Sequence, residues 1–423
     1  MSQVTSRSEL GRLREGQVLD VDLTLAEASA LNVSKLVSVT PGAGGWQVTA
    51  AYAVGALNVG GLVVRVAPKV GTVQVLRLLA RAHGVRRLDL DDAHVGLHDE
   101  PDLSVVLAVL FAQEARLALA SGSLRGYRTE DQTLSVVRGR LRVRDQELRR
   151  FGVVVPIEVT VDEWTTDTDE NRRILAATRR LSVLPGLPDD TRRVLRHVDR
   201  LLADVRLPPP GQVLPPWTPT RLTVRLHRLL RLADLVLSEA SVEHRVGDVE
   251  AHGFVVPMEK LFEDLVARLL AELDDGVQIS AQSTYALDTL GRMTIRPDLV
   301  FRSGGVEVAV ADTKYKVLDD KGKLRNDDGY QLLAYCTRLG LAVGHLVYAS
   351  GSLPAEPYRL LGSGVQLNLH TIDMGQSVEA IEHDVALLRR GLLTGESNDL
   401  VWTDLDGVRL GEGVGDVSAV AAG

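Results

Sequence analysis

The sequence predicts a mixed α/β protein, α+β overall, in which a small β-rich N-terminal domain and a helical middle region precede a C-terminal mixed sheet flanked by helices. Alternating valine-rich segments in the first hundred residues predict short strands. Apolar residues at helical spacing dominate from there to about residue 250. From residue 258 onward the patterns follow the order α-β-β-β-α-β-β-α, which is typical of a mixed sheet with helices on both sides.

These patterns divide the chain into four segments. Residues 1–100 form a β-rich domain that we expect to bind a partner, and residues 101–250 form a mixed, mainly helical domain. Residues 251–410 hold the mixed sheet, and residues 411–423 form a Gly- and Val-rich tail that we expect to be flexible. The proline-rich segment 207–217 cannot form regular structure and marks a linker or a domain boundary.

The composition is that of a soluble globular protein, because 45% of the 423 residues are hydrophobic and 25% are charged. We find no apolar run of about 18 residues and no signal peptide, which favours the cytoplasm and no membrane partner. The single cysteine, Cys336, excludes an internal disulfide and a cysteine-rich zinc site, and we expect it to be a small buried hydrophobe. The formal net charge of -8 argues against nonspecific coating of nucleic acid but allows DNA contact through local basic patches.

Before residue 250, alternation and helical spacing predict the elements in order. Strands are expected at residues 17–23, 46–54, 62–67 and 153–161. Helices are expected at residues 72–83, 101–119, 172–184, 190–205 and 222–240. The acidic segment 162–171 leads into the third of these helices, where Thr168 or Asp169 suits a helix cap better than a metal site.

An arginine-rich segment at residues 137–144 is predicted to be a strand whose period of two places one face entirely in positive charge. The residues on that face are Arg138, Arg140, Arg142 and Arg144. Four like charges in a row are costly unless anionic groups meet them. DNA, a partner protein, and solvent with acidic neighbours all remain open as the surroundings of this face.

After residue 250, a helix is expected at residues 258–272, and a hairpin follows at residues 298–314. Further strands are expected at residues 277–280, 293–295, 344–349 and 365–372. Further helices are expected at residues 328–338 and 377–392.

The predicted hairpin holds two carboxylates and a lysine. Asp298 precedes its first strand, and the second strand ends in Asp312 and Lys314. The Ser-Gly-Gly sequence at residues 303–305 lets the chain reverse, which brings Asp298 beside Asp312. Asp312 and Lys314 are two residues apart on a strand and therefore point to the same face. A simple Asp–Lys ion pair at a strand end is the alternative interpretation.

These groups suit phosphodiester hydrolysis, which needs an activated water and neutralisation of charge on the phosphate. A hard divalent cation supplies both, and carboxylate oxygens bind it. We therefore expect Asp298 and Asp312 to hold Mg2+, with Mn2+ as an alternative, and Glu263 to complete the metal shell from the preceding helix. Lys314 would orient the water or stabilise charge on the phosphate.

Two further residues are expected to contribute to this site. Gln331 shares a helix face with Tyr335, so it reaches the metal centre or a phosphate, or else forms a polar edge on a core helix. Lys316 lies on the Asp312 face and is expected to contact the DNA backbone.

Three motifs together resemble the core of the PD-(D/E)xK nucleases, and more narrowly the McrC family of McrBC-type modification-dependent restriction systems. They are Arg296-Pro-Asp298, Val310-Ala-Asp-Thr-Lys-Tyr-Lys316 and Gly329-Tyr-Gln-Leu-Leu-Ala-Tyr335. Leu261-Phe-Glu263 is similar to the helix that opens this core. Weaker similarities extend upstream, so the resemblance covers the chain from about residue 48 to residue 372.

The resemblance implies a PD-(D/E)xK fold and an Mg2+-dependent endonuclease subunit that cuts double-stranded DNA. It implies a hexameric AAA+ GTPase partner, similar to McrB, whose GTP hydrolysis the chain stimulates. The implied catalytic residues are Asp298, Asp312 and Lys314, with Glu263 and Gln331 in support. The chain contains no P-loop motif of its own. The alternatives are a non-enzymatic adaptor of an AAA+ motor with a vestigial nuclease fold, and a stand-alone repair nuclease.

Overall fold

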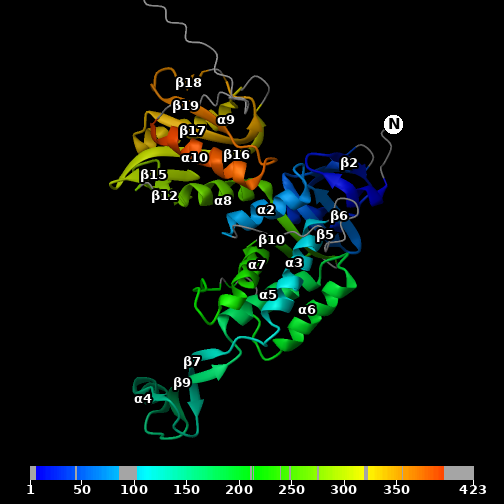
Figure 1. Ribbon diagram of the computed structural model, residues 1–423, viewed down its shortest axis with the longest axis vertical. Coiled ribbons are helices and arrows are strands. Elements are labelled where there is room, and N and C mark those ends of the chain that lie inside the picture. The colour runs from blue at the N-terminus through cyan, green and yellow to red at the C-terminus, as the bar shows by residue number, and fades with distance from the viewer. Residues whose placement is uncertain are drawn as a thin grey trace, which may run out of the picture.

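The chain folds into an elongated molecule with a large mixed sheet at one end and a narrow arm at the other (Figure 1). The computed structural model describes residues 6–42, 45–84, 102–209, 212, 214–238, 240–246, 249–273, 276–318, 323–354 and 356–394. Several mixed sheets pack with helices, so the predicted α+β class is confirmed. No helix within these ranges is long and apolar enough to cross a membrane. The tail predicted at residues 411–423 lies outside them.

The large sheet contains the predicted C-terminal strands except the one at residues 293–295, and it adds β18 (Tyr358–Arg359), which was not predicted. In spatial order its strands are β12 (Gln278–Ala281), β15 (Leu299–Ser303), β16 (Val306–Leu318), β17 (Val343–Gly351), β19 (Gln366–Thr371) and β18. Strands β15 and β16 pair antiparallel, whereas β16, β17 and β19 are parallel to one another. The predicted hairpin is confirmed. Its turn uses Gly304 and Gly305 at φ angles of +58° and +84°, which side chains disfavour.

Alternation along β16 divides its side chains between two cores. Val310 packs in the core that includes Leu332 of helix α9 (Asn326–Leu339). Its neighbour Ala311 belongs to the core that includes helices α8 (Met258–Ala271) and α10 (Val378–Thr394). The large sheet is therefore covered on both faces, as predicted. A short ribbon of β13 (Tyr285–Ala286) and β14 (Thr294–Ile295) lies in the connection to β15.

A second sheet, the N-terminal sheet, combines strands from distant parts of the chain. In spatial order it contains β1 (Leu13–Arg14), β6 (Leu62–Ala67), β5 (Ala53–Val59), β11 (Val249–Pro257) and β10 (Ala240–Val246). The pairing of β5 with β11 requires glycine at position 55, because a Cβ there would lie 2.0 Å from the Phe254 carbonyl oxygen. The sequence predicted neither β10 nor β11. Strand β11 crosses residue 250, where we placed a segment boundary.

A small third sheet lies next to the N-terminal sheet. It contains β2 (Val18–Val21), β4 (Gly45–Ala50) and β3 (Val37–Gly42). Helix α1 (Leu25–Ser34) packs against β3, and the 3₁₀ helix η1 (Arg7–Arg12) packs against β6 of the N-terminal sheet. The single strand predicted at residues 46–54 is wrong. The chain changes sheets at Ala51 and Tyr52, so that β4 and β5 are separate strands.

The middle of the molecule is helical, as predicted. Its helices are α2 (Thr72–Ala82), α3 (Leu103–Ala118), α5 (Asp169–Ser182), α6 (Asp189–Leu201), η2 (Val224–Leu226) and α7 (His227–Ser238). Their buried faces form one continuous apolar core with α8, α10 and the large sheet. The Thr168 side chain caps α5 by accepting from the Asn171 N–H at 3.3 Å, which confirms the predicted cap.

A buried arginine ties the middle region to the large sheet. The Arg81 guanidinium on α2 is 6% exposed and makes two hydrogen bonds to Glu272, of 3.1 and 2.6 Å, at the end of α8. It also donates to Glu382 of α10 at 2.5 Å. The Arg81 hydrogen bonds hold the pKa of Glu272 down at about 2. Arg81 therefore fixes α2 against both helices on one face of the large sheet.

The arm comprises residues 126–165 and projects from the helical region (Figure 1). It is built from β7 (Gly126–Leu134), β8 (Arg140–Leu141), α4 (Val143–Arg150) and β9 (Ile157–Thr165). Strands β7 and β9 pair antiparallel along their whole length, and three buried side chains of β9 form a small core.

The arginine-rich strand predicted at residues 137–144 is wrong. Gly139 has a φ angle of +78°, and β8 pairs with β9 over only two residues before α4 begins at Val143. A Cβ at position 139 would lie 2.2 Å from the Thr160 carbonyl oxygen, so the turn there depends on glycine. Because Arg144 lies in the helix, the four arginines do not form one row on a strand.

Two buried histidines lie within the large sheet. His345 on β17 and His370 on β19 are 1% and 4% exposed, and their Nδ1 and Nε2 atoms are 3.0 Å apart. Burial lowers the pKa of His345 to about 3, with a further contribution from His370, and lowers that of His370 to about 4. Both imidazoles are therefore neutral in the folded protein at neutral pH.

The histidine pair predicts acid sensitivity. An unfolded histidine titrates near 6.5, so the unfolded state binds the extra proton first as the pH falls. The lowered histidine pKa therefore leaves the folded state fully stable above about pH 6.5, and this stability is lost as the pH falls towards the pKa of the folded state. For one such histidine, the free energy of unfolding falls by about 2 kcal/mol when the pH is lowered from 7.5 to 5. Denaturant unfolding at several pH values measures this loss, and His370→Asn should reduce it by roughly that amount. An unchanged pH dependence in the variant would contradict the assignment.

Candidate functional site

The β15–β16 hairpin brings Asp298 beside Asp312. Leu299 pairs with Ala311, so the next residues outward from this pair are the two aspartates. The Asp298 carboxylate is anchored, because its Oδ2 accepts from the Thr313 N–H and the Thr313 hydroxyl, both at 2.8 Å. Two donors on one oxygen hold that carboxylate in a single orientation.

Asp312 is the buried carboxylate of the site, with 2% of its surface exposed. Lys314 Nζ lies 2.6 Å from Asp312 Oδ2, an ion-pair contact that lacks hydrogen-bond geometry. Burial, and next the charge of Asp298, raise the pKa of Asp312 to about 6. Two carboxylates this close, one of them buried, favour positive charge between them, of which Lys314 supplies one.

Lys314 is held by a short chain of hydrogen bonds from α9. Its Nζ donates to Gln331 Oε1 at 2.9 Å, and Gln331 Nε2 donates to the Tyr335 hydroxyl at 2.7 Å. That hydroxyl donates to the Arg296 carbonyl oxygen at 3.3 Å, which closes the chain next to Asp298. Burial opposes the charge on Lys314, but the Asp312 carboxylate outweighs it and raises the pKa of the lysine. The predicted shared face of Gln331 and Tyr335 is confirmed.

Glu263 reaches the site through a residue that the sequence analysis missed. Gln282, at the end of β12, donates from Nε2 to Glu263 Oε1 and lies 3.5 Å from Asp298 Oδ1. Burial, and next the charge of Asp298, raise the pKa of Glu263. Gln282 has a φ angle of +56°, which is uncommon for a residue other than glycine. No local sequence signal marks such a position.

The donor set fits a hard divalent cation held by two carboxylates. No group of three His, Cys, Asp or Glu side chains gathers closely enough to hold a metal within the residues that the structure describes. Mg2+ does not need such a cage, since it is commonly bound by one or two carboxylates and keeps several waters. Asp298 and Asp312 supply that pair, while Gln282 lies between Glu263 and Asp298.

Asp328 is a second buried carboxylate that the sequence analysis did not single out. It is 4% exposed and accepts from the Tyr348 hydroxyl at 3.1 Å. Lys316 Nζ lies 4.0 Å from Asp328 Oδ1, so Lys316 points to the α9 side of the sheet. The sequence showed Asp328 only as one of several acidic residues near the start of a helix, a place usually explained by the helix dipole.

The four arginines of residues 138–144 do not reach the site. All lie in the arm, at the opposite end of the molecule from the large sheet (Figure 1). Arg138 lies 3.5 Å from Glu163, and Arg142 contacts Asp131 and Asp145. The structure therefore brings together Asp298, Asp312, Lys314 and Gln331, with Glu263 and Lys316 at the margin, and separates the arginines from them.

Comparison with known proteins identifies related chains. A family model described as "McrBC 5-methylcytosine restriction system component" matches residues 48–349. A chain from the Thermococcus gammatolerans assembly of McrB AAA+ hexamers with bound McrC matches with a TM-score of 0.55 and 20% identity. This match covers 91% of the present chain and 99% of the other, so the two share a fold.

A chain of the Thermococcus gammatolerans McrBC complex also matches, with a TM-score of 0.41 and 22% identity, over 61% of the present chain and 86% of the other. No curated protein sequence matches the chain significantly.

The Thr313 contacts predict a measurable contribution to stability. Thr313→Val removes the hydroxyl that bonds Asp298 but keeps the backbone N–H. We expect the free energy of unfolding to fall by about 1.5–3 kcal/mol, the range for hydrogen bonds to charged groups. Thr337→Val is the matched control, because its exposed hydroxyl bonds only within α9. Equal losses in the two variants, measured by denaturant unfolding, would show that Asp298 is not anchored as described.

Proposed function

Because this chain belongs to the family of McrBC 5-methylcytosine restriction system components, we propose that it is the DNA-cleaving subunit of such a system. In this proposal it is a metal-dependent endonuclease that hydrolyses phosphodiester bonds of double-stranded DNA in the cytoplasm. The supporting observation is the buried Asp312 carboxylate next to Asp298 and Lys314, within β16, which continues past the predicted strand end to Leu318. A vestigial fold has no need to keep such a costly group buried.

The side chains divide the work of hydrolysis between them. Asp298 and Asp312 would hold Mg2+, or Mn2+ in its place, which when bound supplies Lewis-acid stabilisation and lowers the pKa of water. Lys314 stays cationic, since its pKa is raised, and donates to a phosphate oxygen as negative charge develops there. Gln331 and Tyr335 keep the ammonium of Lys314 in place. Glu263 orients Gln282 against Asp298.

We propose that the arm, rather than residues 1–100 for which we predicted this role, binds a motor partner, a hexameric AAA+ GTPase similar to McrB. Large apolar side chains are exposed along the arm, which is unusual for a surface without a partner. They include Phe151 at 91%, Val154 at 78%, Tyr127 at 78%, Val136 at 73% and Leu148 at 72% exposure. The matched McrC is bound to McrB AAA+ hexamers, and an equivalent partner would stimulate and drive this chain. This role and DNA cleavage use opposite ends of the molecule.

The two alternative functions make different demands on these features. A non-enzymatic adaptor of an AAA+ motor would need the arm but not the Asp298–Asp312 pair. A stand-alone repair nuclease would need the carboxylates but not an apolar arm. The structure holds both features, which supports a nuclease subunit that works with a partner.

We expect Asp312→Asn and Lys314→Met each to lower the rate of Mg2+-dependent DNA cleavage by at least about a thousandfold, since each removes charge at the reacting phosphate. The assay follows cleavage of methylated duplex DNA by the chain with its GTPase partner. The variant Glu263→Gln is compared with Asp264→Asn as its matched control. Asp264 lies on the same helix, and the ion pair that it makes within the described residues is with Lys260. Full activity in Asp312→Asn would overturn the nuclease assignment.

A separate prediction concerns the arm. The double variant Phe151→Asp with Val154→Asp should lose the stimulation of the partner's GTP hydrolysis, because two charges would replace apolar contacts. Leu361→Asp is the control, since Leu361 is fully exposed and lies in the large-sheet region. GTP turnover with increasing amounts of each variant measures the effect. Unimpaired stimulation by the arm variant would move the partner surface elsewhere.

A further inference from the structure

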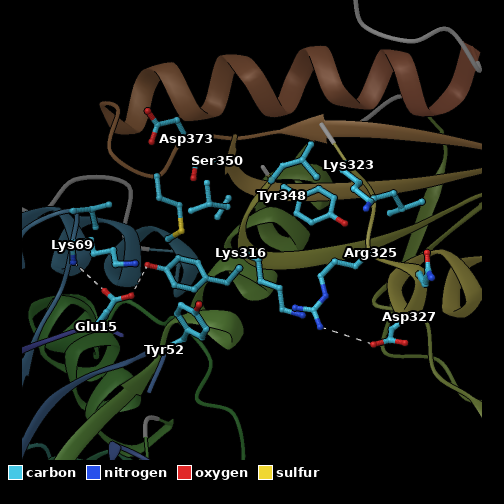
Figure 2. A pocket seen from close by; sticks show the side chains of 18 residues that line it. Glu15, Tyr52, Lys69, Lys316, Lys323, Arg325, Asp327, Tyr348, Ser350 and Asp373 are labelled. Carbon is cyan, nitrogen blue, oxygen red and sulfur yellow. Dashed lines mark hydrogen bonds and ion pairs between the residues drawn. The ribbon is translucent and has the colours of Figure 1, made fainter. Parts of the chain in front are cut away.

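A cavity of about 870 Å³ lies where the N-terminal residues meet the large sheet. Figure 2 shows its walls: Glu15, Tyr52 and Lys69 come from the N-terminal part of the chain, and the opposite wall comes from β16, β17 and the start of α9. The cavity opens at the carboxyl ends of the parallel strands β16 and β17, which is where α/β sheets place their ligands. No residue of the predicted site except Lys316 lines it.

Positive charge converges on this cavity from three segments. Lys69 follows β6, Lys316 lies on β16, and Lys323 and Arg325 precede α9. This concentration is unexpected in a chain with a formal net charge of -8. Clustered cations on several segments repel one another unless an anion or a carboxylate lies among them.

The carboxylates that line the cavity offset part of this charge. The oxygens of Glu15 accept from the Lys69 backbone N–H at 3.0 Å and the Tyr315 hydroxyl at 3.1 Å. Asp327 is 86% exposed and lies 3.9 Å from Arg325, and Asp328 lies 4.0 Å from Lys316. Four cationic side chains and three carboxylates line the cavity, which leaves an excess of one positive charge among the lining residues.

The cavity and the candidate active site are neighbours along β16, because Lys316 lines the cavity. Lys314 and Lys316 are two residues apart on that strand, which corresponds to about 7 Å. The strand is irregular between Lys314 and Val317, and Lys316 still points towards Asp328 on the α9 side. Arg325 at the N-cap of α9 also lines the cavity, although the first turn of that helix carries Asp327 and Asp328. A chain of anionic groups that passes Lys314 would meet Lys316 and Arg325 next.

We propose that this cavity binds backbone phosphates of the DNA strand next to the phosphate that is cut. The inference rests on the proposed nuclease function and assigns Lys69 and Arg325, together with Lys316, to substrate binding. It also gives the N-terminal part of the chain a direct role in holding DNA, since Lys69 lies more than two hundred residues before the large sheet.

The test compares DNA binding by the full chain and by the double variant Lys69→Gln with Arg325→Gln. Binding of a short fluorescent duplex is measured with Ca2+ in place of Mg2+, at salt concentrations between about 50 and 200 mM. Each lost phosphate contact should reduce the slope of log K against log salt by about 0.9, so the double variant should lose roughly 2. Lys69→Arg with Arg325→Lys keeps both charges and should restore the wild-type slope.

The matched control is Arg179→Gln with Arg193→Gln, which removes two exposed arginines from α5 and α6. Its slope should stay at the wild-type value. Equal slopes for the cavity variant and this control would overturn the proposal. So would displacement of DNA by GTP from the wild type but not from the cavity variant, because the cavity would then hold a free nucleotide. A wild-type chain that binds DNA with the expected slope but never cleaves it, alone or with its partner, would instead refute the proposed function.

Discussion

Burial of the Asp312 carboxylate is the constraint on which the C-terminal half of the molecule depends. The carboxylate lies within β16, a strand enclosed by two apolar cores, where an unpaired charge is costly. Lys314 offsets part of that cost, and the surrounding residues then hold Lys314 and Asp298 in place. Burial of this charge lowers stability, and buried groups with shifted pKa values cluster at functional sites, which is consistent with the cation site that we propose here.

The N-terminal residues are attached to the same strand. Tyr315, between Lys314 and Lys316, donates to buried Glu15 at 3.1 Å and packs edge-on against Tyr52. Arg81 fixes α2 against α8 and α10 on the neighbouring face. The large sheet and the N-terminal sheet are thus joined by buried polar contacts as well as by a shared apolar core, so a displacement of one is felt at β16.

Within the described residues, the elements of the arm pack mainly on one another. Its core contains three buried side chains of β9, and most of its apolar residues face outward. A soluble protein tolerates an exposed apolar surface of this kind only when it is a small part of the total surface. Covering that surface with a partner is favourable, because the apolar area is removed from water. In the proposed function, partner contact and DNA chemistry therefore lie at different ends of one chain.

The sequence by itself determined the features that depend on neighbours along the chain. The glycine turn, the period of two on β16 and the helical spacing of α8, α9 and α10 are local, so the hairpin and the meeting of Asp298 with Asp312 followed from them. The tertiary structure alone decided the roles of Gln282 and Asp328, the pairing of β11 with β5, and the end of the arginine-rich strand at β8. These features depend on contacts between separate elements. Gln282 contributes to the site because it lies between Glu263 and Asp298, and the length of β8 is set by its pairing with β9. Periodicity reports which face of an element is buried, but it carries no information about what that face meets.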